Sequence, residues 1–118
     1  MRTINFLAAT LMLATGICFS AGSQQEAEQL QQINNNSIKK MEDAKKALTH
    51  SINQIVGDMP EEKDEILDLA RAWGQIAKKK CELLIHDSLN TDAEISARND
   101  CLSSEYHDEK VFFEKINL

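Results

Sequence analysis

Cysteine is the residue type in this chain whose chemistry depends most on the compartment around it. The chain has three cysteines, Cys18, Cys81 and Cys101. A cysteine thiolate can attack a substrate or bind a metal, whereas two oxidised thiols form a disulfide. Cys18 lies in an apolar stretch near the N-terminus. The role of that stretch therefore decides which chemistry the other two cysteines can have.

Residues 1–22 have the pattern of a secretory signal peptide. A short polar start with Arg2 precedes an uncharged run at residues 6–19, and the small residues "SAGS" follow. This order of regions predicts export, with cleavage near residues 20–22. A membrane-spanning helix is one alternative, but such a helix needs about 20 apolar residues. Lipid attachment at Cys18 is another, although bulky Ile17 precedes that cysteine where a lipoprotein signal has a small residue.

Removal of the signal peptide leaves an even pair of cysteines, Cys81 and Cys101. An exported protein meets an oxidising compartment, where an even pair indicates a disulfide. Closing a loop of about 20 residues would contribute roughly 3 kcal/mol in a loop-entropy treatment. The alternative is two free thiols.

Other patterns that would indicate catalysis or metal binding are missing from the sequence. The histidines His50, His86 and His107 lack a second ligand-type residue at the spacing of a known zinc motif. Nucleotide-binding glycine loops, a serine nucleophile elbow and the HExxH pattern do not occur either. We therefore predict a protein that is not an enzyme and that uses no metal or cofactor.

The charge of the chain restricts its partners. The net charge of −6 becomes −7 when residues 1–22 are removed, because they contain Arg2 and no acidic residue. Nucleic-acid binding needs clustered lysine and arginine to contact phosphates. We predict no nucleic-acid partner and no membrane span after signal removal. A cationic protein partner fits an acidic chain, since long-range attraction speeds their encounter.

Three helical patterns follow the signal peptide. They cover residues 24–56, 60–85 and 92–115, with breaks at "VGDMP" and "HDSLNT". Residues 23–36 form a Gln/Asn-rich lead-in of poor helix propensity, for which we expect a frayed start. The periodicity predicts an all-α fold, a small antiparallel three-helix domain over residues 37–118 with one disulfide between its second and third helices. In the first pattern the apolar residues at three- and four-residue steps are Leu30, Met41, Ala44, Leu48, Ile52 and Ile55.

The second and third patterns predict the core. Trp73, the single tryptophan, shares the apolar stripe of its helix. We interpret it as a core residue, although a recognition anchor is the alternative, since tryptophan is enriched at binding hot spots. The predicted core residues of these two helices are Trp73, Ile66, Ile76, Leu84, Leu102 and Tyr106.

The stretch "MPEEKDEILDLARAWGQIAKKKC", residues 59–81, and the later pair Cys101–Leu102 give the chain a family resemblance. Residues 40–116 resemble the lysozyme-inhibitor LprI-like family of small exported bacterial proteins. Ala70 to Trp73 occupy the Ala-Gln-Arg-Ala-Trp-like run of that family, and Cys81 comes eight residues after the tryptophan. This sequence departs from the family at Ala70, where glutamine is common, and at Glu109, where arginine is frequent. It also lacks the additional cysteines that many members carry in their first helical segment.

The resemblance implies an all-helical periplasmic or secreted protein, and at least one family member is associated with lysozyme inhibition. We therefore predict an exported binding protein that inhibits lysozyme or a related cell-wall hydrolase, with a cationic lysozyme as its partner. The alternative is a non-inhibitory structural or interaction module of the cell envelope. The sequence makes no prediction of oligomeric state. The partner-binding residues are predicted in the polar loop at His86, Asp87, Ser88 and Asn90.

Overall fold

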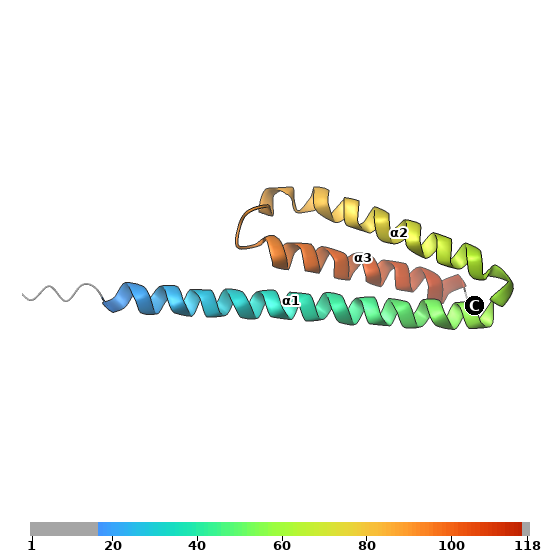
Figure 1. Ribbon diagram of the computed structural model, residues 1–118, viewed down its shortest axis with the longest axis horizontal. Coiled ribbons are helices and arrows are strands. Elements are labelled where there is room, and N and C mark those ends of the chain that lie inside the picture. The colour runs from blue at the N-terminus through green and yellow to red at the C-terminus, as the bar shows by residue number, and fades with distance from the viewer. Residues whose placement is uncertain (1–16, 117–118) are drawn as a thin grey trace, which may run out of the picture.

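A computed structural model describes residues 17–116, with side chains from Gly22 onward. Three long helices form the body: α1 (Ile17–Asp58), α2 (Lys63–Leu84) and α3 (Glu94–Ile116). Two single-turn 3-10 helices, η1 (Pro60–Glu62) and η2 (His86–Ser88), lie in the connections. Helix α2 is antiparallel to both α1 and α3, and these two are therefore parallel to each other (Figure 1). The all-α, three-helix prediction is confirmed.

The contact between α1 and α3 contains most of the core. Residues of α1 that contact α3 recur at alternating steps of three and four residues, as in parallel coiled coils. Facing them, Tyr106 and Phe113 of α3 are buried. Ile66 of α2 completes this apolar cluster near the α1–α2 turn. The α1 residues in the series are Met41, Ala44, Leu48, Ser51 and Ile55.

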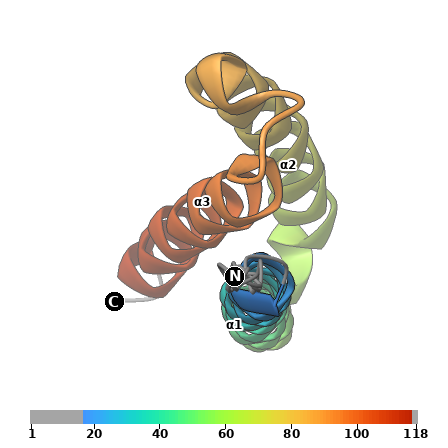
Figure 2. The same ribbon diagram turned by 90° about the vertical axis from the view of Figure 1, so that its left-hand side faces the viewer.

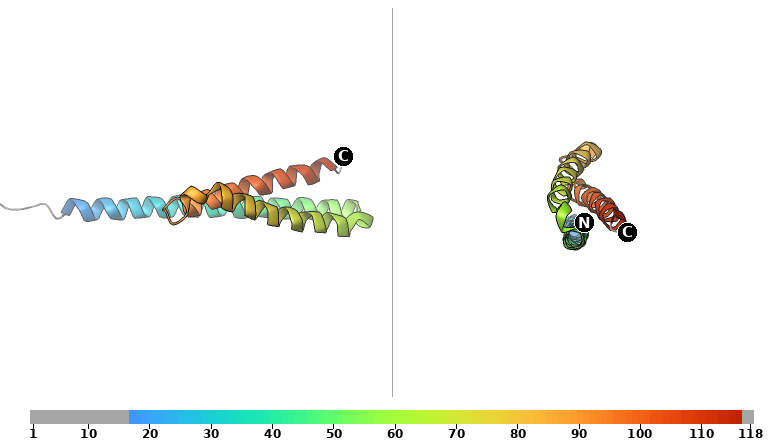
Figure 3. Two further views of the ribbon diagram at one scale, coloured as in Figure 1. Left: turned by 90° about the horizontal axis from the view of Figure 1, so that it is seen from above. Right: turned by 90° about the vertical axis from the view of Figure 1, so that its right-hand side faces the viewer.

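Helix α2 packs mainly on α3 and moves away from α1 along its length. Figures 2 and 3 show α2 beginning beside the end of α1 and ending on the far side of α3. A disulfide joins Cys81 of α2 to Cys101 of α3, whose Cα atoms are 5.7 Å apart. The predicted disulfide is therefore confirmed. It ties the two helices together close to the loop that connects them.

Four of the six predicted core residues lie in the interior or at its edge. Ile66 and Tyr106 are buried, and Leu102 packs against the cluster while partly exposed. The ring of Trp73 is also half-buried, with its centroid 5.3 Å from that of Phe112.

The prediction was wrong for Ile76 and Leu84, which are 57% and 73% exposed. From Trp73 onward, the buried positions follow at steps of four residues: Ala77, Cys81 and then Ile85, directly after α2. Each step of four turns the contact line about 40° around the helix. Residues reached by steps of three, such as Ile76, are therefore turned toward solvent.

The first part of α1 extends beyond the other two helices (Figure 1). The Gln/Asn-rich residues 23–36, for which we expected a frayed start, belong to this continuous helix. Helix propagation costs far less than nucleation, and the packed part of α1 already supplies the nucleus. The predicted signal peptide lies largely outside the described residues; only residues 17–22 are described, as the first turns of α1.

Candidate partner-binding surfaces

The tip loop, residues 85–93, joins α2 to α3 and contains the partner-binding residues predicted from the sequence. Its first residue, Ile85, is buried and donates its backbone N–H to the carbonyl of Cys81 at 3.0 Å. Because Cys81 forms a disulfide with Cys101, the loop begins at the point where α2 is covalently joined to α3. This end of the loop is therefore held firmly.

Local hydrogen bonds also hold the second half of the tip loop. The Thr91 hydroxyl donates to the Ser88 carbonyl at 2.6 Å and accepts from the Ala93 N–H at 3.2 Å. Asn90 has a φ of 61°, the left-handed conformation that asparagine tolerates better than most residues. The side chain of Asn90 is exposed and Ser88 is partly buried. The chain thus reverses direction through a defined turn.

The side chains of the tip loop and of the adjoining end of α2 combine apolar and charged groups. His86 and Asp87 are exposed, and Nδ1 of His86 lies 3.6 Å from Oδ1 of Asp87. Leu83 and Leu84 project into solvent directly before the loop, and Leu89 is also exposed. Such a surface can offer a partner apolar contacts beside a carboxylate.

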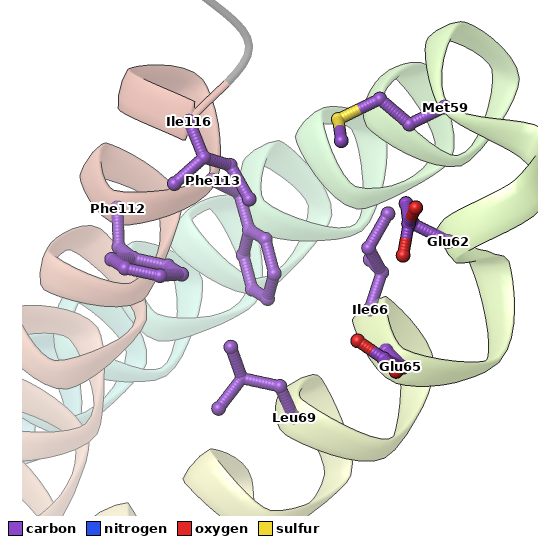
Figure 4. A pocket seen from close by; sticks show the side chains of 8 residues that line it. All are labelled: Met59, Glu62, Glu65, Ile66, Leu69, Phe112, Phe113 and Ile116. Carbon is purple, nitrogen blue, oxygen red and sulfur yellow. The ribbon is translucent and has the colours of Figure 1, made fainter.

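A second surface lies between the start of α2 and the end of α3; we call it the acidic groove. It is a depression of about 370 Å³. In Figure 4, Leu69 from α2 and Phe113 from α3 point into the same space. The apolar residues that line it are Met59, Ile66, Leu69, Phe112, Phe113 and Ile116.

Glu62 and Glu65 form the charged part of the acidic groove. Both are exposed at the start of α2, where carboxylates are also favoured by the helix dipole. Among the residues that the structure describes, no lysine or arginine lines this groove. It therefore has an apolar interior and an edge of negative charge.

Glu109 places an ionisable carboxyl group in the interior of the helix bundle. It is only 1% exposed, and its Oε2 has no hydrogen-bond partner within the described residues. Burial raises the pKa of the Glu109 carboxyl from 4.5 to about 7, because the carboxylate loses its hydration. Burial, and then the charge of Glu109, raise the pKa of Tyr106 as well. The carboxyl is thus protonated in much of the folded population near neutral pH.

Polar contacts also join α3 to its neighbours, among them an ion pair between Lys40 of α1 and Asp100, at 3.6 Å. Nζ of Lys80 on α2 lies 2.7 Å from Oε1 of Glu105, which is nearly buried. Ser51 on α1 donates its hydroxyl to Glu114 at 3.1 Å. Hydrogen bonds from Lys110 and Ser51 lower the pKa of the Glu114 carboxyl. These side chains already have partners within the fold, so we do not assign them to the tip loop or to the acidic groove.

Within residues 17–116, no group of three histidine, cysteine or acidic side chains is arranged to hold a metal ion. None of the helices in this range is long and apolar enough to cross a membrane.

The acidic groove was not predicted from the sequence, whereas the tip loop was. The loop is recognisable from its polar residues between two helical patterns. The groove depends on how far the ends of α2 and α3 separate, which periodicity does not determine. One signal was present: Glu62 stands four residues before Ile66, and Glu65 stands four residues before Leu69.

Compared with protein-family models, curated proteins and solved structures, the chain matches none of them. The resemblance to the LprI-like family therefore rests on the residues alone.

Proposed function

We propose that this chain is an exported helical binding protein of the LprI-like kind, which inhibits a lysozyme or a related cell-wall hydrolase through its tip loop. The observation that supports the proposal is a disulfide-anchored tip loop whose Asp87 carboxylate is exposed beside Leu83 and Leu84 at the end of α2. A loop that is ordered before binding loses less conformational entropy when it enters a partner's cleft.

The charge of the chain supports a cationic partner. The mature chain would carry a net charge of −7, while C-type lysozymes are strongly cationic. Opposite charges raise the association rate, and they do so most at low ionic strength. In this proposal the leucines of the tip supply apolar contact and Asp87 pairs with a cation of the enzyme.

Export is part of the same proposal. The disulfide between Cys81 and Cys101 fits the periplasm or the medium, where thiols become oxidised. The signal pattern of residues 1–22 supports this location independently.

The second candidate function is a non-inhibitory interaction module of the envelope. The observation that favours it is the acidic groove (Figure 4), which is lined by residues at the start of α2, whereas the tip loop follows the end of that helix. A protein with apolar surfaces at both ends could connect two partners without blocking an active site.

The deciding experiment measures lysis of bacterial cell walls by a C-type lysozyme in the presence of the oxidised protein lacking residues 1–22. We expect lysis to slow at protein concentrations on the order of 1–10 µM in low salt, a typical affinity for an interface of modest size. Unchanged lysis under these conditions would refute inhibition of lysozyme and favour the second candidate.

A matched pair of variants tests the role of the tip loop. The double variant Leu84→Ser/Asp87→Asn should weaken inhibition about tenfold, as expected for loss of a central contact. The control Val111→Ser/Asp108→Asn likewise replaces one aliphatic residue by serine and one aspartate by asparagine, at exposed positions of α3, and should inhibit like the parent. Equal inhibition by both variants would show that the tip loop is not part of the interface with the enzyme.

A further inference from the structure

The acidic groove exposes apolar surface that the fold itself does not cover. Its interior contains the buried side chains of Phe113 and Ile66. Its edges are different, because Leu69 and Ile116 each remain 40% exposed. A continuous apolar depression of this kind, bordered by polar groups, is typical of an interaction site.

The charges at the groove select the partner. Glu62 and Glu65 line it, and neither carboxylate has a cationic partner among the ion pairs of the described residues. Placing an uncharged apolar segment here would bury part of these carboxylates without compensation, which is unfavourable. A segment that brings lysine or arginine beside its apolar side chains would avoid that cost.

We propose that the acidic groove binds a basic amphipathic helix of a protein partner. The apolar face of that helix, at positions i, i+3, i+4 and i+7, enters the space between Leu69 and Phe113. Its cationic side chains pair with Glu62 and Glu65. The proposal does not rest on the tip loop or on lysozyme inhibition, since it concerns the other end of the molecule.

Trp73 provides a direct signal for occupancy of the groove. It is the single tryptophan of the chain, and its ring centroid is 5.3 Å from that of Phe112, which lines the groove. A helix entering the groove would change the surroundings of Phe112 and hence of Trp73. The intrinsic fluorescence of the protein therefore reports binding by a peptide that has no tryptophan.

The probe is a synthetic peptide of about 15 residues, long enough to form a helix on binding, with leucine at the spacing given above and lysine elsewhere. We expect saturable binding to the oxidised protein, with a Kd on the order of 10–100 µM for a peptide that must order itself. A peptide with glutamate in place of every lysine should not bind measurably. Saturable binding of this acidic peptide with equal affinity would overturn the proposal.

Variants with equal charge changes separate groove binding from general attraction. The double variant Glu62→Gln/Glu65→Gln should weaken binding about fivefold or more, since two charge pairs are lost. The control Glu26→Gln/Glu28→Gln removes the same charge from exposed positions of α1 and should change the affinity less than about twofold, through long-range attraction alone. Equal weakening by the two variants would overturn the proposal.

The apolar part of the groove has its own test. Leu69→Ser should weaken binding about tenfold, whereas Val111→Ser on the outer face of α3 should have no effect. All of these positions are exposed enough for the variants to fold, which far-UV circular dichroism checks. A fatty acid is the competing probe: if it binds more tightly than the peptide and is unaffected by Glu62→Gln/Glu65→Gln, the groove takes a small apolar ligand instead.

Discussion

The two ends of the helical body are stabilised in different ways. The apolar end, near the α1–α2 turn, contains the main cluster of large buried side chains, including Ile55, Ile66 and Phe113. The disulfide end, near the tip loop, buries mostly small or polar side chains and is joined by the bond between Cys81 and Cys101. The buried residues of that end are Ser37, Ala77, Cys81, Ile85, Asn99 and Ser103.

This difference shows how a small helical protein can extend its fold beyond its core. A chain of this size buries too little apolar surface to cover three long helices equally well. At the disulfide end, restricting the unfolded chain takes the place of apolar burial. The tip loop, together with the exposed leucines at the end of α2, can then remain ordered although it lies far from the core.

The largest expected effect is at the apolar end, for Phe113→Ala. Phe113 is 1% exposed, and its ring centroid lies 5.5 Å from that of Phe112. Truncating it leaves a cavity, so we expect the free energy of unfolding to fall by about 3–5 kcal/mol. Urea denaturation of the oxidised protein measures this. Val111→Ala, at an exposed neighbouring position, is the control and should change the value by less than about 0.5 kcal/mol.

The disulfide end should respond to Cys81→Ser/Cys101→Ser, which removes the bond without leaving a free thiol. We expect a loss of about 3 kcal/mol, from the loop-entropy treatment of a loop of this size. Hydrogen exchange should speed up around the tip loop more than around Ile55. A variant that melts at the temperature of the oxidised parent would show that the bond does not stabilise this end.

Between the two ends, Glu109 should make stability depend on pH. Its pKa is raised from 4.5 to about 7 by burial, so between these values the folded protein holds a proton that the unfolded chain has lost. The free energy of unfolding should therefore fall as pH rises from about 4.5 to about 7, and this contribution should level off above that.

Glu109→Gln tests this dependence because the amide cannot ionise. At pH 8 the variant should be more stable than the parent, on the order of 2 kcal/mol, while the two should be similar at pH 4. Thermal melts across this pH range measure the difference. Glu82→Gln, at an exposed position of α2, should leave the difference near zero. A stability gain that is the same at both pH values would argue against ionisation of Glu109.

The smallest expected effect is for Ile76→Ser, on the surface between the two ends. Ile76 is 57% exposed, so we expect a change of less than about 0.5 kcal/mol in the free energy of unfolding. The buried Ile66, on the same helix, should show a loss of about 2–5 kcal/mol when changed to alanine. If Ile76→Ser destabilises the protein as much as Ile66→Ala does, the contact face assigned to α2 is wrong.

The sequence predicted the three helices, their order and the disulfide, because these depend on local patterns. Long periodic stretches without proline set the helices, and the pair Cys81 and Cys101 was the remaining even set of thiols. Two apolar positions, Ile76 and Leu84, were misplaced since a stripe of mixed three- and four-residue steps is wider than the line that α3 contacts. The direction of this contact line along α2 depends on the angle at which α2 and α3 cross. The sequence pattern of one helix does not determine that angle.

The candidate surfaces were predictable only in part. The tip loop was identified from its composition, but the leucines before it were placed in the core or left unassigned. Glu109 was not recognised as buried, although it follows Leu102 and Tyr106 and precedes Phe113 at helical steps. An acidic residue on an apolar stripe is a signal that could have identified it.

The disulfide also determines how the molecule would respond to a stretching force. The start of α1 and the end of α3 lie toward opposite ends of the body in Figure 1, so a force applied there acts along these two helices. Once the helices give way, the bond between Cys81 and Cys101 keeps the 20-residue loop closed. At about 3.5 Å per residue, the oxidised chain would extend about 70 Å less than the reduced chain. The redox state of Cys81 and Cys101 would thus determine the maximum length of the stretched chain.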